Sequence, residues 1–214
     1  MFAVIFEVNP RPEAWDAYLG HAATLRPELV AIEGFIANER YASLSRPGWL
    51  VSLSIWRDEK ALVRWRTHAL HHEIQGKGRS SVFADYHLRV GEIVADSRMD
   101  TRPARQRLDA TEVAALKAVT LTERSLEPGA ARPRSGNVSD GNVSDGNVSD
   151  GNVPDGDVFN SITRPGNALY LRAWPDVAAA EAGITGTPGH HRVVQVIRDY
   201  GMFARTEAPQ YFPA

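Results

Sequence analysis

Two spacings of apolar residues alternate along the chain, and each change of spacing marks a predicted element. Residues 2–8 form a short apolar run rich in strand-forming side chains. From Trp15 to Leu29 the apolar positions recur with the period of an amphipathic helix. The elements predicted for the rest of the first half are strands at 35–43, 49–56 and 83–94 and a helix from Asp58 to about Gln75. The order β-α-β-β-α-β is typical of the ferredoxin-like unit.

A repeated set of landmarks indicates that the second half copies the first. Arg46-Pro47-Gly48 and Trp56 recur at the same spacing as Arg164-Pro165-Gly166 and Trp174. The landmarks that follow in the same order are His71-His72 with His190-His191, and Asp85-Tyr86 with Asp199-Tyr200. A unit whose sheet is open on one face must bury that face against its copy. We therefore predict an α+β fold in which two ferredoxin-like units, the second degenerate, pack sheet to sheet as a pseudo-dimeric α/β barrel.

The second copy lacks a helical pattern where its first helix should stand. Repeats of Gly-Asn-Val-Ser-Asp, beginning at Gly136, occupy this place. Such polar residues cannot bury enough apolar surface to offset the entropy of ordering, so 127–156 is predicted to be a disordered insertion. A calcium-binding coil is the alternative for this segment. The predicted organisation is a first unit at 1–95, a connector at 96–113 and the degenerate second unit at 114–214.

Composition and charge exclude several classes of protein. A net charge of −2 with interspersed signs gives no reason to expect nucleic acid or an anionic membrane as a partner. Cysteine is absent, which rules out disulfides and a thiol nucleophile. The first residues lack the basic region of a signal peptide, and no apolar run approaches the ~20 residues that span a bilayer. We expect a cytoplasmic protein.

The second predicted helix carries the candidate chemistry. If 58–75 is one helix, Trp65 and His72 lie on the same apolar face, whereas His71 points toward solvent. An imidazole beside an indole can accept a proton from an aromatic ligand or donate a hydrogen bond to it. The alternative is a histidine at the edge of the core. His68 and His72 have the helical spacing of zinc ligands but lack the glutamate of that motif, so no metal site is predicted.

Several segments together resemble the antibiotic biosynthesis monooxygenase family of dimeric α/β-barrel proteins. The segments that carry the resemblance are Phe2-Ala3-Val4-Ile5-Phe6, Trp56, the stretch from Trp65 to Arg79, and Asp85-Tyr86-His87-Leu88-Arg89-Val90. Residues 1–95 carry most of it, and 114–214 resembles a degenerate second unit. The resemblance implies, for some members, oxygenation of phenolic substrates by O₂ without metal, flavin or haem. It assigns His72 as base or hydrogen-bond donor and Trp65 as a ring-stacking wall.

The resemblance leaves two other functions open. One is a non-catalytic ligand-binding or stress-associated barrel protein. The other is haem binding and degradation, for which Asn9 at the end of the first strand would be relevant, although Trp65 and His72 are closer together than in haem-degrading relatives. For the first hypothesis the expected partners are a small aromatic molecule and O₂, with no cofactor. The assembly expected is an intramolecular pseudo-dimer, with a homodimer as a further option.

Overall fold

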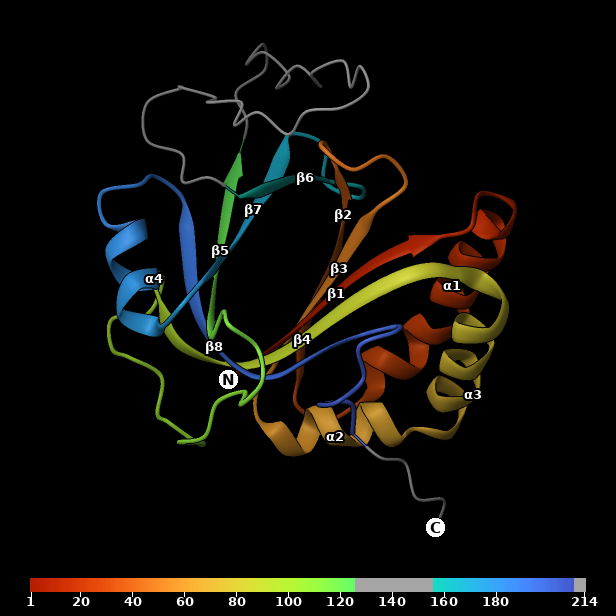
Figure 1. Cartoon of the computed structure of the whole chain (residues 1–214), viewed down its shortest axis with the longest axis horizontal. Coiled ribbons are helices and arrows are strands. Elements are labelled where there is room, and N and C mark those ends of the chain that lie inside the picture. The colour runs from red at the N-terminus through yellow and green to blue at the C-terminus, as the bar shows by residue number, and fades with distance from the viewer. Residues whose placement is uncertain (126–155, 210–214) are drawn as a thin grey trace.

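The computed structural model describes residues 1–125 and 156–209, and in this part of the chain eight strands close into a barrel in the order β1-β3-β2-β6-β7-β5-β8-β4 (Figure 1). The strands are β1 (Phe2–Pro10), β2 (Phe35–Ser43), β3 (Leu50–Trp56), β4 (Phe83–Asp96), β5 (Ala118–Ser125), β6 (Asp157–Ser161), β7 (Asn167–Trp174) and β8 (His190–Gly201). The predicted insertion lies outside the described residues except for Gly156.

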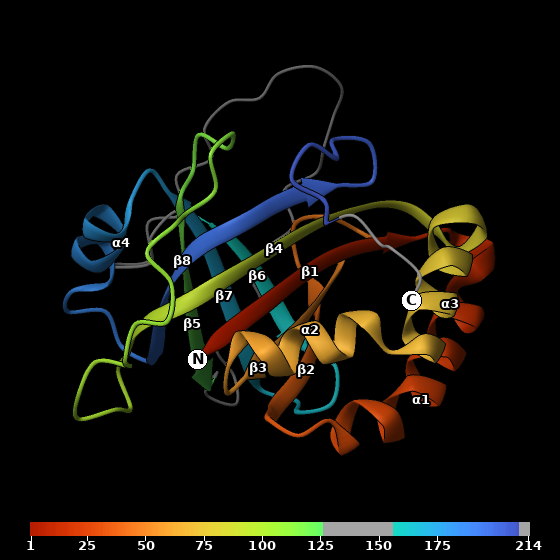
Figure 2. The same cartoon turned by 90° about the horizontal axis from the view of Figure 1, so that it is seen from below.

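Helices cover the outside of the barrel on two opposite sides, as both views show (Figures 1 and 2). The helices are α1 (Trp15–Ala31), α2 (Glu59–Thr67), α3 (Ala69–Lys77) and α4 (Val177–Ile184), with short helical turns η1 (Pro12–Ala14) and η2 (Gly78–Val82). The first three lie against the first unit and α4 lies against the second. None of the helices in the described part of the chain is long and apolar enough to cross a membrane.

The two units join edge to edge. Strand β4 pairs with β8 from His87↔Gly201 to Asp96↔Arg192, and β2 pairs with β6 around Tyr41↔Ser161. Side chains alternate along each strand, so every second residue points into the barrel. The inward residues form the main core, which includes Ala3, Ile5, Tyr41, Val51, Leu53, Ile93, Leu121, Phe159, Leu169 and Val194. The predicted pseudo-dimeric barrel of two ferredoxin-like units is confirmed.

The repeated tryptophans hold equivalent places on the outer face of the barrel. Trp56 is fully buried, and its indole N–H donates to Ser54 Oγ at 2.9 Å. Trp174 donates in the same way to Thr120 Oγ1 at 3.0 Å. Gly183 on α4 lies so close to the Trp174 ring that an added Cβ would meet it at 1.9 Å. Both tryptophans therefore fix a helix onto the sheet, as expected for core residues.

The predicted single helix from Asp58 to Gln75 is wrong in one respect, because it breaks at His68. Asp58 caps α2 as predicted, its Oδ1 accepting from Ala61 N at 2.8 Å. The backbone of His68 is extended (φ −60°, ψ 128°), and α3 starts at the next residue. The break leaves carbonyls at the end of α2 without their helical donors. One of them, Trp65 O, accepts instead from the backbone N–H of His68 and bonds to the imidazole of His71.

Two clusters of charged residues lie at opposite ends of the barrel interior. The Glu7 cluster comprises Glu7, Arg46, His87, Arg89, Asp157 and Asp199, and the Glu123 cluster comprises Glu123, Arg164, His190, Arg192, Glu39 and Asp96. Each glutamate follows the apolar inward residues of the first strand of its unit. Because β1 and β5 run in opposite directions around the barrel, the two clusters lie at opposite ends.

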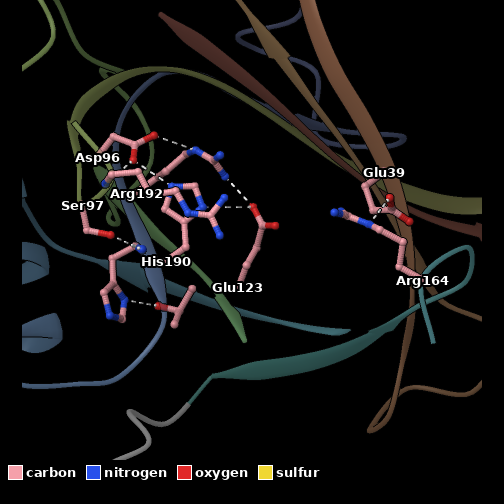
Figure 3. A network of polar contacts seen from close by, with 10 residues as sticks. Glu39, Asp96, Ser97, Glu123, Arg164, His190 and Arg192 are labelled. Atoms are coloured by element: carbon pink, nitrogen blue, oxygen red, sulfur yellow. Dashed lines mark hydrogen bonds and ion pairs between the residues drawn. The ribbon is translucent and has the colours of Figure 1, made fainter. Parts of the chain in front are cut away.

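The contacts within the two clusters match, except that Arg46 meets Glu7 whereas Arg164 meets Glu39. Glu7 meets Arg89 at 3.1 Å and Glu123 meets Arg192 at 2.5 Å. His87 bonds Asp199 across the β4–β8 seam, and His190 bonds Asp96 across the same seam at 2.7 Å (Figure 3). The strand register thus makes His190 the counterpart of His87, because they pair with Glu123 and Glu7 respectively. The sequence analysis matched His190-His191 to His71-His72, which was wrong, since His190 and His191 lie on a strand.

Candidate active site on the helix-facing side of the first unit

The helix-facing side of the first unit is closed at both ends and open in the middle. Phe2 and Val8 on β1 are fully buried, whereas Val4 and Phe6, which lie between them on the same face, are half-buried. The barrel-facing side chain between them, Ile5, is again fully buried. Solvent therefore reaches the middle of this face. We call it the floor, and define it by Val4, Phe6, Asn38, Arg40, Ser52, Leu88 and Val90, all half-buried.

Strand register arranges the floor in rows across the sheet. Arg40 on β2 lies opposite Ser52, Ser52 lies opposite Phe6, and Phe6 lies opposite Leu88. The next row runs in the same way from Asn38 through Val4 to Val90. The floor is therefore polar over β2 and β3 and apolar over β1 and β4. Such a surface suits a molecule with one polar end and an apolar body.

The polar end of the floor contains a fixed amide. Asn38 Nδ2 donates to Ser52 Oγ and to the carbonyl oxygen of Leu53, both at 3.1 Å. Because the carbonyl can only accept, this end of the amide must be the nitrogen. Both of its N–H groups are then engaged, so Asn38 Oδ1 is the atom that can accept a further hydrogen bond.

Arg40 lies beside Tyr18 of α1, which forms part of the helix layer. Burial raises the pKa of the Tyr18 hydroxyl, and the charge and hydrogen bond of Arg40 oppose that rise only in part. The Tyr18 hydroxyl therefore keeps its proton at neutral pH. The Nε of Arg40 is buried and has no hydrogen-bond partner. This guanidinium was not among the predicted site residues, because nothing in the alternation of β2 marks it.

Two histidines flank the ring of Trp65. The imidazole of His71 stacks on the indole at 4.1 Å with an interplanar angle of 15°, and His68 stacks at 5.9 Å and 27°. His71 Nδ1 lies 2.9 Å from Trp65 O. Since a carbonyl only accepts, Nδ1 carries the proton and Nε2 bears the lone pair, facing Gln75 Nε2 at 3.4 Å. Burial lowers the pKa of His71 to about 4, so the imidazole is neutral at physiological pH.

The structure separates the two predicted site residues onto different helices. Trp65 ends up at the end of α2, packed on the same buried cluster as Val4 and Val90 of the floor. His72 lies on α3 and is half-buried. The predicted shared face is wrong because the chain breaks at His68, and it is His71 that stacks on Trp65. No glycine or proline marks the break, so it could not be predicted from the residues around His68. The role assigned to His72 stays a prediction.

The apolar end of the floor is bordered by positive charge. Leu88 lies opposite Tyr200 of β8, which is half-buried. Burial, more than the neighbouring Tyr86, raises the pKa of Tyr200, while Arg205, Arg66 and Arg79 are close enough to oppose the rise. Arg205 also donates to the hydroxyl of Tyr86. These arginines come from the tail, α2 and η2, which lie far apart in the sequence. Within residues 1–125 and 156–209 no group of three or more acidic or histidine side chains could hold a metal ion.

Comparison with known proteins places the chain in a family. The sequence model of a family described as antibiotic biosynthesis monooxygenase matches residues 1–77. The chain is 44% identical over 219 residues to a jasmonate monooxygenase ABM of Pyricularia oryzae, covering 100% of this chain and 99% of that protein. The solved structure of Rv0793 from Mycobacterium tuberculosis is 21% identical over 45% of this chain and 97% of its own, with a TM-score of 0.41.

The solved structure of an anthrone oxidase-like protein covers 98% of this chain and 96% of its own, at 12% identity and a TM-score of 0.35. The relative from Pyricularia oryzae aligns with the whole chain, both units included. The chain belongs to the antibiotic biosynthesis monooxygenase family.

Proposed function

We propose that this protein is a monooxygenase that binds a small, largely apolar organic acid of the jasmonate type on the floor of the first unit. The observation that carries the proposal is the exposure of Val4 and Phe6 between the fully buried Phe2 and Val8. An apolar surface open in the middle of an otherwise closed layer is the kind of site that small ligands occupy. The full-length similarity to a jasmonate monooxygenase supports this class of substrate.

The electron balance of the reaction separates two classes of substrate. In hydroxylation of a C–H bond, one atom of O₂ enters the substrate and the other leaves as water, which requires two protons and two electrons. An alicyclic acid of the jasmonate type cannot supply these electrons, so an external two-electron donor such as a reduced nicotinamide or flavin is required. A phenolic substrate of the anthrone type can supply both electrons itself as a methylene group becomes a carbonyl group.

Phenolic oxygenation is the second candidate, and the stack on Trp65 favours it. A flat aromatic ring could lie along the indole as the His71 ring does, with Trp65 as the ring-stacking wall. Formation of a phenolate needs a proton acceptor. In this proposal His72 is the base or hydrogen-bond donor, and His71 Nε2 is the competing acceptor because its lone pair is already defined by the bond from Nδ1 to Trp65 O.

The test measures incorporation of ¹⁸O from ¹⁸O₂ by mass spectrometry, together with O₂ uptake. Jasmonic acid with and without NADPH and reduced flavin is compared with anthrone without any reductant. The proposal expects labelled, hydroxylated jasmonate only when a reductant is present. Labelled anthraquinone without a reductant would instead favour the phenolic candidate, and His72→Ala and His71→Ala would then show which imidazole takes the proton.

Two outcomes would favour the other functions considered. Binding of both compounds without any ¹⁸O in either product would support a non-catalytic ligand-binding barrel. A Soret shift on titration with haemin would support haem binding, and its absence would remove that alternative. A Trp65→Ala variant serves as the common control, because loss of the ring wall should weaken binding whichever substrate is correct.

A further inference from the structure

We propose that Arg40 is the anchor for the carboxylate of the substrate, so that the ligand lies across the floor with its acid group over β2 and its apolar body over Phe6 and Leu88. The inference rests on the proposed function only in taking the floor as the ligand site. It adds the charge of the ligand, its direction on the sheet and the residue that selects it.

The first observation is that Arg40 lacks the partner that comparable arginines have. Arg46 and Arg89, which are also half-buried, meet Glu7 at 2.6 and 3.1 Å, and Arg192 meets Glu123 at 2.5 Å. No ion pair among the described residues includes Arg40. Its Nε is buried without a hydrogen-bond partner, as is that of Arg46, but the other end of the Arg46 guanidinium meets Glu7. Burial of such a donor is unfavourable unless an acceptor satisfies it. A carboxylate matches the planar guanidinium with two parallel hydrogen bonds.

The second observation is the polar setting of Arg40 on the floor. The protonated hydroxyl of Tyr18 lies beside it and can donate to the same carboxylate. Ser52 is its cross-strand neighbour, and the amide of Asn38 is fixed in the next row. The guanidinium of Arg40 and the hydroxyl of Tyr18 are therefore the donors at the β2 end of the floor, and the free Oδ1 of Asn38 in the next row is an acceptor. No carboxylate of the described chain fills this place.

The third observation is that the floor changes from polar over β2 and β3 to apolar over β1 and β4. Neighbouring strands lie about 4.8 Å apart, so Phe6 on β1 is ~10 Å and Leu88 on β4 is ~14 Å from the strand of Arg40. A carboxylate held by Arg40 with an apolar ring and chain of about that length would cover both residues. Trp65 packs beside the neighbouring row of Val4 and Val90, so its fluorescence should report the apolar body of the ligand.

The residue that takes the place of Arg40 in the second unit is Val158, which supports a role for Arg40 that is specific to the first unit. Val158 pairs with Tyr170 as Arg40 pairs with Ser52. The Arg40 charge is therefore not part of the repeated scaffold. It occurs only in the unit whose floor is open.

The experiment measures binding of jasmonic acid and of its methyl ester, which differs in lacking the charge, by calorimetry and by Trp fluorescence. The wild-type protein should bind the acid more tightly than the ester. Arg40→Gln should weaken binding of the acid about 10- to 100-fold, the usual range for loss of a charge-assisted pair, and leave the ester unchanged. Arg40→Lys should recover part of the loss. Arg26→Gln, on the exposed side of α1, is the matched control.

The outcomes separate this inference from the proposed function. If the protein prefers the acid, the preference depends on Arg40 and no ¹⁸O is incorporated, the result would support Arg40 as the carboxylate anchor and contradict the proposed monooxygenase activity. Equal binding of acid and ester by the wild type, or unchanged acid binding in Arg40→Gln, would overturn the anchor even if turnover is observed. If Arg40→Gln binds neither compound, Arg40→Lys decides, because a retained acid preference with the charge restored supports the anchor and a lost one overturns it.

Discussion

The inner and outer surfaces of this barrel have diverged to different degrees between the two units. Inside, the Glu7 and Glu123 clusters repeat the same four-way contact of glutamate, arginine, histidine and aspartate. Outside, the floor of the first unit is open and carries Arg40. The equivalent face of the second unit holds a cavity of about 10 Å³, which has room for one water molecule. The residues that line it include Thr120, Thr122, Gly156 and Tyr170.

This difference separates the residues that close the barrel from those that are available to bind a ligand. Val4 and Phe6 of the first floor correspond by register to Thr120 and Thr122 in the second. What both units keep, the inward clusters, joins β4 to β8 and so closes the barrel. A feature that only one unit has, such as Arg40, is not required for the fold that both units share. We therefore expect substitutions in the clusters to change stability, and substitutions on the first floor to change binding.

The largest effect is expected from Asp96→Asn in the Glu123 cluster. Burial raises the pKa of Asp96, but hydrogen bonds from Arg98 N and His190, together with the charge of Arg192, hold it below its usual range. Removing the charge leaves Arg192 without this partner and weakens the bond to His190, which should lower the free energy of unfolding by about 3 kcal/mol. Urea denaturation measures the change.

The equivalent variant Asp199→Asn should lose less, because the Asp199 side chain is 15% exposed and that of Asp96 is 7% exposed. Asp16→Asn, on the exposed side of α1, is the control. A loss confined to one cluster would show that the repeated contacts do not share a structural duty. Any change in ligand affinity beyond that of the control would contradict the separation of fold and site.

A smaller and opposite pattern is expected from Arg40→Val, which gives the first floor the residue of the second. Acid binding should fall about 10- to 100-fold because the charge-assisted pair is lost. Stability should not fall, because the half-buried guanidinium has no carboxylate partner to lose. Calorimetry and thermal unfolding of the same samples measure the two effects. A fall in stability with unchanged affinity would assign Arg40 to the scaffold.

A pH dependence of stability is expected from the helix layer of the first unit, where His71 stacks on Trp65. Burial lowers the pKa of His71 to about 4, whereas the unfolded chain has the ordinary value near 6.5. The unfolded state therefore binds a proton that the folded state does not. The stability is full above about pH 6.5 and falls as the pH drops toward 4, by about 1–3 kcal/mol.

The variant His71→Gln should flatten that dependence while its amide can still donate to Trp65 O. Urea denaturation between pH 4 and 7 checks this against His21→Gln, a histidine of α1 outside the Trp65 stack. If the free energy of unfolding of His71→Gln depends on pH as that of the wild type does, another group causes the loss of stability at low pH.

The sequence predicted the fold well because its signals are local or repeated. The apolar run at 2–8 and the repeated Arg-Pro-Gly turns are enough to indicate two like units, and Asp58 indicated a helix start that the structure confirms. The break at His68 could not be predicted, because an orphan carbonyl at Trp65 is satisfied by an imidazole several residues later. That contact exists only once the chain has turned.

The site was predicted only in part for the same reason. Trp65 was proposed for the site because tryptophan is rare and its spacing in the sequence is helical, and its role stays a prediction. Arg40 was not proposed because two features single it out only in the folded chain: its buried Nε has no hydrogen-bond partner, and it lies beside a tyrosine of α1. The match of His190 with His87 rather than His71 likewise follows from strand pairing, which residue order alone does not contain.

The smallest effects are expected at two equivalent helix caps. They test whether ligand binding depends on the first unit alone. Asp58 Oδ1 accepts from Ala61 N at 2.8 Å at the start of α2, and Asp176 Oδ1 accepts from Ala179 N at 2.7 Å at the start of α4. Replacement of either by Ala should lower the free energy of unfolding by about 1 kcal/mol, because a helix N–H loses its acceptor.

Only the first cap belongs to the helix that carries Trp65, so only Asp58→Ala should also loosen the wall beside the floor. We expect a several-fold weaker binding of jasmonic acid in Asp58→Ala and unchanged binding in Asp176→Ala, measured by Trp fluorescence at matched folded fraction. Equal losses of affinity in both variants would mean that binding follows global stability, and the division of duties between the two outer faces would then fail. A loss in Asp176→Ala alone would place the ligand against α4.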